Sequence, residues 1–252
     1  MALTDNLIAY WSLDEASGNA IDAHSTHDLT ETSGTIGSAS GKVGNCRDFE
    51  AGDTEWFEIA DNADLSLADE DFTFSAWVQL ESKGAMRCIL TKDNGSAGEY
   101  YFQFDNAADR FELEIWNGPG YANKGEIQAN NLGSPSLSTW YFLVAWYDAS
   151  ANTLNIQANN GTVDSVSFSG GTQNNTGKVY LGSSVYDQVW DGLIDEVGFW
   201  KRVLTSDERT TLYNAGAGLA YPFGGGGGGA TFSELVNGGL IDCGLINGGL
   251  VA

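Results

Sequence analysis

The sequence predicts an all-β fold, a sandwich of two antiparallel sheets, and three observations carry the prediction. Several segments alternate apolar and polar residues with a period of two, the spacing of a strand with one buried face. Clusters of Gly, Asn, Asp and Ser separate these segments at short intervals, as turns do in sandwiches. Only one stretch carries the signals of a helix, so strands must supply the core.

The length and composition suit one main domain, which we expect over residues 1–223. The chain has 252 residues, 42% of them hydrophobic, with 8 Trp, 10 Tyr and 12 Phe. Sandwiches of this size are commonly single domains with one substantial core.

The clearest strands lie in the middle of the chain. In residues 72–80 the even-numbered positions are all apolar, whereas the odd-numbered positions are mostly polar. Residues 100–104 repeat the pattern, and residues 111–115 place apolar side chains opposite Glu112 and Glu114. These segments are predicted to be strands with one face in the core.

The segment WYFLVAWYD, residues 140–148, is apolar on both faces. This pattern is typical of a central strand covered by a second sheet. A turn over residues 148–152 then leads into the alternating residues 154–158, which predicts a hairpin.

One short helix is expected after residue 205. Thr205 and Glu208 form a capping box, and Gly216 or Gly218 supplies the stop. Leu212 and Tyr213 are expected to dock this helix against an edge of the sandwich.

The C-terminal end has a different composition. Six consecutive glycines begin at Gly224 and predict a linker over residues 224–230, because glycine has no side chain to bury. Residues 231–252 then repeat with a period of five, which fits stacked turns or a segment gripped by another surface. We expect this tail to dock on a partner or on a second copy of the chain, the alternative being a low-complexity end. The apolar positions expected to dock are Leu235, Leu240, Ile241, Leu245, Ile246 and Leu250.

Charge and hydropathy exclude several classes of partner. The net charge of −23, from 34 acidic and 11 basic residues, repels the phosphates of nucleic acids. No apolar run approaches the ~20 residues needed to span a bilayer, so membrane insertion is not expected. The N-terminal stretch lacks the basic and apolar regions of a signal peptide, although a secreted protein whose signal was removed would look the same.

The cysteines and histidines give no sign of a disulfide framework or a zinc site. Cys46, Cys88 and Cys243 form an odd set without CxxC spacing. Cys46 and Cys88 are interpreted as buried apolar residues, with a Cys46–Cys88 bridge as the alternative. His24 and His27 lack a third nitrogen or sulfur ligand nearby.

Five blocks together resemble one known family. They are LIAYWSLDEASGNAIDAHSTHD (7–28), GKVGNCRDFEAGDTEWFEIAD (41–61), FTFSAWVQL (72–80), STWYFLVAWYD (138–148) and GLIDEVGFWKRVLTSDE (192–208). These blocks are similar to the laminin-G-like module of the concanavalin A-like lectin/glucanase superfamily, as found in bacterial surface and phage structural proteins. The resemblance covers residues 5–221 and implies a jelly-roll sandwich without identifying a ligand.

The resemblance also implies one structural calcium ion. It places the candidate ligands at Asp22 and Asp195, with Glu15, Asp28 and Glu196 as second choices. Carboxylates beside turns rich in carbonyl groups suit Ca²⁺, which prefers six to eight oxygen ligands. The alternative is that these acids cap turns or face water.

Two loops carry the residues expected to bind sugars. Sugar recognition in such sandwiches uses aromatic faces and planar polar groups in a shallow site. One loop contributes Trp116 and Tyr121, and the other contributes Tyr186 and Trp190. Trp116 shares the strand face of Glu114 and so points away from the core. The alternative is that these rings plug one end of the sandwich.

No pattern of catalytic residues is present. The superfamily's glucanases carry a Glu-x-Asp-x-x-Glu strand motif, which does not occur in this sequence. A Gly-x-Ser-x-Gly elbow and a phosphate-binding P-loop are also missing. We therefore expect a protein that binds and does not catalyse.

Two functions fit these observations. The favoured one is a structural or display protein of a large assembly, a phage virion, as head decoration or tail appendage. Its sandwich would be exposed, and its tail beyond Gly229 would dock on other virion proteins or form a homo-oligomer. The missing signal peptide, the glycine spacer, the apolar repeat and the acidic surface favour it. The alternative is a carbohydrate-binding module or adhesin, extracellular or on a bacterial surface, that binds surface glycans.

Overall fold

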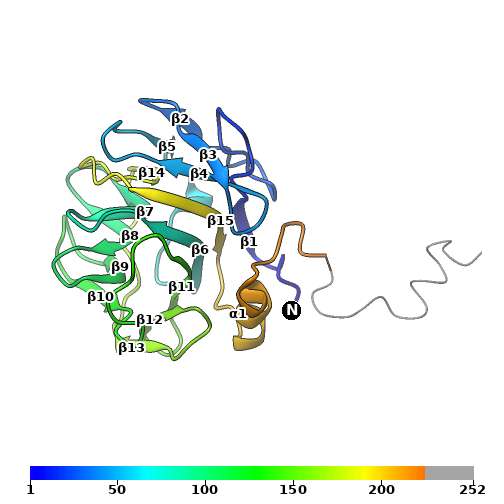
Figure 1. Ribbon diagram of the computed structural model, residues 1–252. Coiled ribbons are helices and arrows are strands. Elements are labelled where there is room, and N and C mark those ends of the chain that lie inside the picture. The colour runs from blue at the N-terminus through cyan, green and yellow to red at the C-terminus, as the bar shows by residue number, and fades with distance from the viewer. Residues whose placement is uncertain (225–252) are drawn as a thin grey trace, which may run out of the picture.

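The computed structural model describes residues 1–224 and consists of two antiparallel sheets packed face to face (Figure 1). The first sheet has eight strands, and β1 pairs with β15 beside the path β13-β12-β11-β6-β15-β4-β3. Its strands are β1 (Leu7–Trp11), β3 (Gly37–Ser40), β4 (Asn45–Phe49), β6 (Phe72–Leu80), β11 (Trp140–Asp148), β12 (Thr153–Ala158), β13 (Asp164–Ser167) and β15 (Gly192–Trp200).

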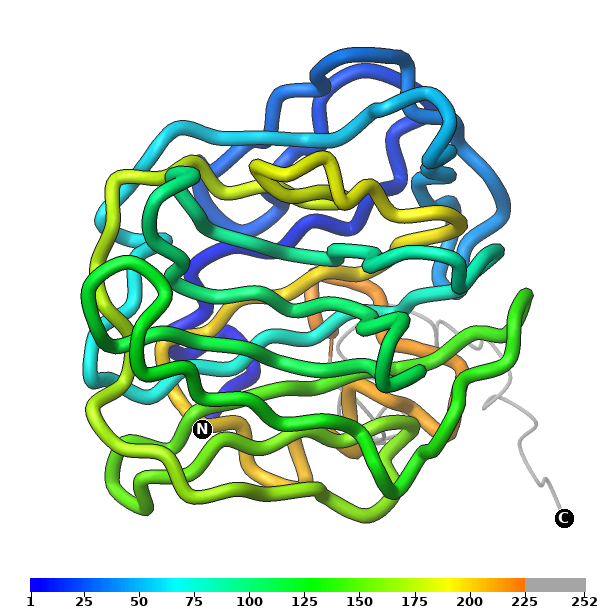
Figure 2. Tube along the Cα trace, turned by 90° about the vertical axis from the view of Figure 1, so that its left-hand side faces the viewer, coloured from blue at the N-terminus to red at the C-terminus, as the bar shows by residue number. Residues whose placement is uncertain are grey.

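The second sheet has seven strands in the spatial order β10-β9-β8-β7-β14-β5-β2. Its strands are β2 (Thr30–Thr32), β5 (Trp56–Ile59), β7 (Arg87–Asp93), β8 (Gly98–Asp105), β9 (Arg110–Trp116), β10 (Lys124–Gln128) and β14 (Lys178–Leu181). Figure 2 shows strands from distant parts of the chain running side by side, as the strand orders of the two sheets require. The predicted all-β sandwich is confirmed.

The core between the sheets follows the alternation in the sequence. The even-numbered residues of β6 lie in this core, together with the even-numbered residues 100–104 of β8 and the odd-numbered residues 111–115 of β9. Phe74 of β6 stacks on Phe102 of β8 and meets Phe199 of β15 edge-on. The predicted hairpin is also present, with Leu143–Asp148 of β11 paired to β12.

The helix α1 (Ser206–Tyr213) covers the outer face of the eight-stranded sheet. The capping box of Thr205 and Glu208 forms as predicted. The predicted stop was wrong, because Asn214 ends the helix in a left-handed conformation (φ 48°, ψ 53°) before either glycine is reached. Two short 3-10 turns, η1 (Ala63–Leu65) and η2 (Asn214–Gly216), complete the helical elements of the described residues. Within residues 1–224 there is no helix of the length and apolarity needed to cross a bilayer.

The docking of α1 explains the second apolar face of β11. Tyr213 stacks on Trp77, and Phe142 of β11 packs against both rings. Arg209 lies over the ring of Trp146. The helix thus docks on a sheet face, not on the predicted edge, and it covers the side of β11 for which a second sheet was expected.

Cys46 in β4 and Cys88 in β7 are both buried and free. Their interpretation as small buried residues is confirmed, and the alternative bridge between them is not formed. Cys243, the linker after Gly224, and the tail positions Leu235, Leu240, Ile241, Leu245, Ile246 and Leu250 lie outside the described residues.

Candidate functional site

The two loops expected to bind sugars meet at one end of the seven-stranded sheet. Tyr121 lies in the loop between β9 and β10, and Tyr186 lies in the loop between β14 and β15. Their hydroxyl oxygens are 2.6 Å apart. The two side chains are 42% and 52% exposed, so both rings present surface to solvent. Residues 65 positions apart in the sequence thus form one aromatic surface, named here the tyrosine pair.

Asp93, the last residue of β7, holds the tyrosine pair from below. The Tyr121 hydroxyl lies 2.9 Å from both carboxylate oxygens, and the Tyr101 hydroxyl donates to Oδ2 at 2.9 Å. The Tyr186 hydroxyl also donates to Gly95 O at 3.3 Å, so the backbone after β7 holds the second ring of the pair. Asp93 is only 1% exposed. Burial raises the pKa of Asp93, although the donation from Gly95 N–H and from the two tyrosines acts in the opposite direction.

Trp116 lies on the outer face of its sheet, as its parity predicts, but it is only 6% exposed. Its ring meets those of Tyr101 and Tyr121 nearly at right angles, with centroids 5.3 and 5.7 Å away. The ring lies across Gly98, where a Cβ atom would come within 2.6 Å of it. Trp116 therefore forms the floor of the site and not the exposed stacking surface that we expected.

Trp190 was wrongly predicted to contact a sugar. Its side chain is fully buried and belongs to the core between the sheets. Its backbone N–H donates to Gly182 O at 2.7 Å, which fixes the chain two residues before β15 begins. For Trp190 the alternative interpretation, a ring that plugs the sandwich, holds.

Gln173 secures the loop that carries Tyr121. Its Nε2 donates to the carbonyl oxygens of Gly98 and Gly120, at 2.7 Å in each case, and its backbone N–H donates to Trp116 O. On the other loop, Tyr186 N–H donates to Ser184 Oγ at 3.1 Å. Sequence reasoning missed Gln173 and Asp93, because neither lies in a motif and their roles arise only from the fold.

A second polar group lies farther along the outer face of the same sheet. Three carboxylates meet there, and one oxygen from each lies within 4.8 Å of the other two, an arrangement that suits a cation. They belong to Glu112, Glu114 and Glu126. The Lys124 ammonium group already contacts Glu114 and Glu126, so the protein supplies this cation itself. Burial, together with the charge of Glu114, raises the pKa of Glu112 to about 7. Glu112 is 1% exposed, which leaves it without the access to a glycosidic bond that a hydrolase acid needs.

The predicted calcium ligands hold two different loops. Asp22 Oδ1 accepts from the N–H groups of Tyr10 and His24, and its Oδ2 accepts from Ser25 Oγ and His27 N–H. These four hydrogen bonds make Asp22 a loop-capping carboxylate with little capacity left for a metal.

Asp195 differs from Asp22 in having an oxygen to spare. Its Oδ2 accepts from the N–H groups of Lys42 and Val43, whereas its buried Oδ1 accepts no hydrogen bond within the described chain. Burial raises the pKa of Asp195 to about 7. A calcium ion would therefore find a ligand oxygen at Asp195 and not at Asp22.

The second-choice calcium ligands also serve local structure. Glu15 accepts from Ile21 N–H at 2.9 Å, Asp28 accepts from Asp22 N–H at 2.8 Å, and Glu196 bonds to the Tyr10 hydroxyl. The predicted calcium site stays a prediction.

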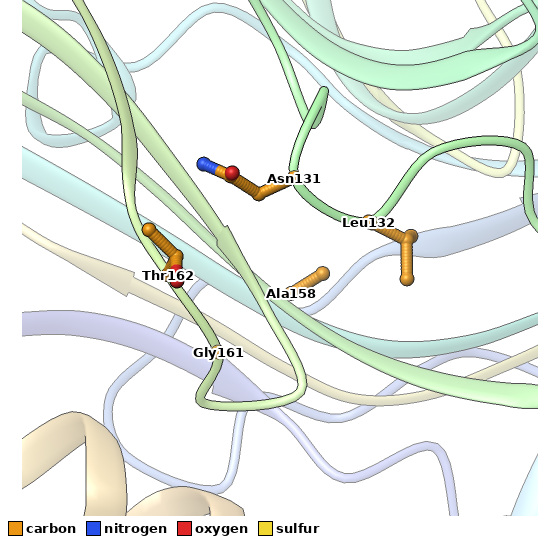
Figure 3. Close-up of a pocket in the computed structure, with 5 residues that line it drawn as sticks. All are labelled: Asn131, Leu132, Ala158, Gly161 and Thr162. Atoms are coloured by element: carbon orange, nitrogen blue, oxygen red, sulfur yellow. The ribbon is translucent and has the colours of Figure 1, made fainter.

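A shallow hollow of about 210 Å³ lies between the turn from β12 to β13 and the loop after β10 (Figure 3). It is lined by Asn131, Leu132, Ala158, Gly161 and Thr162. The amide nitrogen of Asn131 donates to Asp164 at 2.8 Å and is not free for a ligand. This hollow follows the far end of β10 and contains no residue of the tyrosine pair.

Comparisons with known proteins agree with this architecture. A family model described as the concanavalin A-like lectin/glucanases superfamily matches residues 51–208. No curated protein matches the chain in sequence.

Three solved structures illustrate the similarity of fold. Domain 4 of AbnA, a GH43 extracellular arabinanase from Geobacillus stearothermophilus in complex with arabinotriose, has a TM-score of 0.62 and 16% identity. That alignment covers 81% of this chain and 97% of the other. The binding domain of Paraclostridial Mosquitocidal Protein 1 has a TM-score of 0.64 and 12% identity, over 85% and 53% of the two chains. The binding domain of Botulinum Neurotoxin DC in complex with SialylT has a TM-score of 0.62 and 11% identity, over 85% and 52%. This chain thus spans about half the length of the two toxin chains.

Proposed function

The chain belongs to the concanavalin A-like lectin/glucanase superfamily, and from this premise we propose that it is a carbohydrate-binding module whose glycan lies on the tyrosine pair. The observation that carries the proposal is the direct bond between two exposed tyrosines from separate loops. A sugar ring packs its C–H groups on aromatic faces, and rings held in advance lose little entropy on binding.

The surroundings of the tyrosine pair support this role. Asp93 and Gln173 hold the loop that carries Tyr121, and Tyr121 bonds in turn to Tyr186, so the aromatic surface is preformed. The carboxylate of Asp187, an exposed residue next to Tyr186 in the sequence, offers an acceptor for sugar hydroxyls.

The similar structures support the choice of ligand class. One is a complex with arabinotriose, and another is a toxin binding domain in complex with SialylT. We place the protein outside the cell or on a cell surface, where such glycans occur. The virion role, the homo-oligomer and the docking tail stay predictions, because they depend on residues 231–252, outside the described part of the chain.

The test is a screen of the full chain on an array of diverse oligosaccharides, followed by calorimetric titration of the best ligand. Tyr121→Ala and Tyr186→Ala should each weaken binding about tenfold, the value of one aromatic contact, and the double variant should lose binding. Leu137→Ala, which removes an exposed apolar side chain elsewhere, is the matched control and should bind normally. Undiminished binding by a folded double variant would refute the site, and a wild type that binds no glycan would refute the function.

A further inference from the structure

We infer that the tyrosine pair selects uncharged glycans and rejects acidic ones that carry a carboxylate, such as sialylated or uronic acid-containing chains. This inference rests on the proposed function and adds the class of sugar that the site accepts. It follows from the charges fixed around the two rings.

The first of these charges lies directly beneath the aromatic surface. Both oxygens of Asp93 are 2.9 Å from the Tyr121 hydroxyl, and the carboxylate is shielded from water. Asp187 follows Tyr186 in the sequence and is exposed. Because a buried charge is screened weakly, a carboxylate on a bound sugar would be repelled by Asp93 across a short distance.

The second observation is that the neighbouring cations are all engaged. Lys178 lies opposite Asp93 on β14, but its ammonium group is 2.6 Å from Glu58. Lys92 is fully buried, 2.8 Å from Glu99.

The remaining nearby cation is engaged in the same way. Lys124, opposite Trp116, contacts Glu114 and Glu126. Among the described residues around the site, no Lys or Arg is thus free to pair with the acidic group of a ligand, as recognition of such a group requires.

The charge of the whole chain acts in the same direction. Because the chain has a net charge of −23, an acidic glycan meets an unfavourable electrostatic potential before it reaches the site. This long-range part falls with salt, whereas the local repulsion from Asp93 persists at higher ionic strength.

The experiment uses pairs of glycans that differ by one acidic sugar, lactose with 3′-sialyllactose and xylotetraose with its glucuronic acid-substituted form. Affinities for the full chain are measured at 50 and 500 mM NaCl. We expect the neutral member of whichever pair binds to be preferred at least tenfold at 50 mM, with a smaller preference at 500 mM.

Asp93→Asn should reduce the preference for the neutral glycan below that of the wild type at both salt concentrations. Asp53→Asn, which removes one charge from an exposed turn between β4 and β5, is the matched control and should leave the preference unchanged. The salt series on the wild type keeps the test decisive if Asp93→Asn does not fold. Equal or tighter binding of the acidic member would overturn the inference and leave the proposed function standing. Binding of no glycan on the array, neutral or acidic, would remove both.

Discussion

Tyr186 and Trp190 are four residues apart in one loop, yet their rings lie in opposite environments. Tyr186 is half exposed and bonds to Tyr121, whereas Trp190 is fully buried in the core. Trp190 also buries an indole N–H that has no hydrogen-bond partner among the described residues. A buried donor without a partner costs stability, so hydrophobic contact with the core must outweigh that cost.

This environment predicts how Trp190 responds to substitution. Trp190→Phe removes the unpaired donor and part of the ring, so it should cost only about 1–2 kcal/mol of unfolding free energy. Trp190→Ala leaves a large cavity and should cost about 3–5 kcal/mol. Urea unfolding measures both values. Glycan binding by Trp190→Phe should stay within twofold of the wild type, and its loss in a folded protein would give Trp190 a direct role in the site.

At the scale of elements, the loop after β9 depends on a residue distant in sequence. Gln173 lies between β13 and β14, and its amide joins the loop at Gly120 to strand β8 at Gly98. Both bonds are 2.7 Å long and share one nitrogen, so a single side chain orients the loop that carries Tyr121.

We expect Gln173→Ala to distinguish the effect of positioning the loop from the effect of the contact that Tyr121 makes with the glycan. The variant leaves two carbonyl oxygens without a donor and should lose about 1–2 kcal/mol of stability. Because Tyr121 itself remains, glycan affinity should fall several-fold and less than in Tyr121→Ala. Thermal unfolding and calorimetric titration provide the two readouts. Wild-type affinity in Gln173→Ala would contradict this role, and Gln173→Glu, which keeps the length but places a charge against two carbonyls, should bind no better than the alanine variant.

The elements also show what sequence reasoning can reach. Residues 72–80 and 140–148 were predictable because burial imposes a period of two, and α1 because a capping box is a local signal. Strands β2, β3 and β13 have only three or four residues, too few for a periodic pattern. The two loops expected to bind sugars could be singled out from their aromatic residues. The exposure of each ring and the contact of Asp93 with Tyr121 depend on pairings between distant strands, which no local pattern encodes.

At the scale of the whole molecule, the excess of acidic groups extends into buried positions. Glu112 on the outer face of β9 accepts from Gln103 and Gln128, and its pKa is raised to about 7 by burial and by Glu114. Burial also raises the pKa of Asp195 to about 7 and the pKa of Glu196 to about 8, so these two acids hold their protons in the folded state as well. Folding therefore retains protons that the unfolded chain would release.

This retention predicts that the domain loses stability as the pH rises. An acid whose pKa is raised on folding binds more protons in the native state, so unfolding free energy falls between its unfolded and folded pKa values. For Glu112 that window runs from about pH 4.5 to about 7. Glu112→Gln stays uncharged throughout, so it should flatten the profile of melting temperature against pH and stabilise the protein by about 1–2 kcal/mol at pH 8.

The matched control for Glu112→Gln is Glu126→Gln, which alters an exposed acid on the same sheet face and should leave the slope nearly unchanged. Asp195 and Glu196 should maintain part of the slope of melting temperature against pH in both variants. Parallel profiles for the wild type and Glu112→Gln would mean that the buried carboxyl ionises in the native state at its ordinary pKa. In that case the amides of Gln103 and Gln128 would offset the cost of burial, since both donate to the carboxylate.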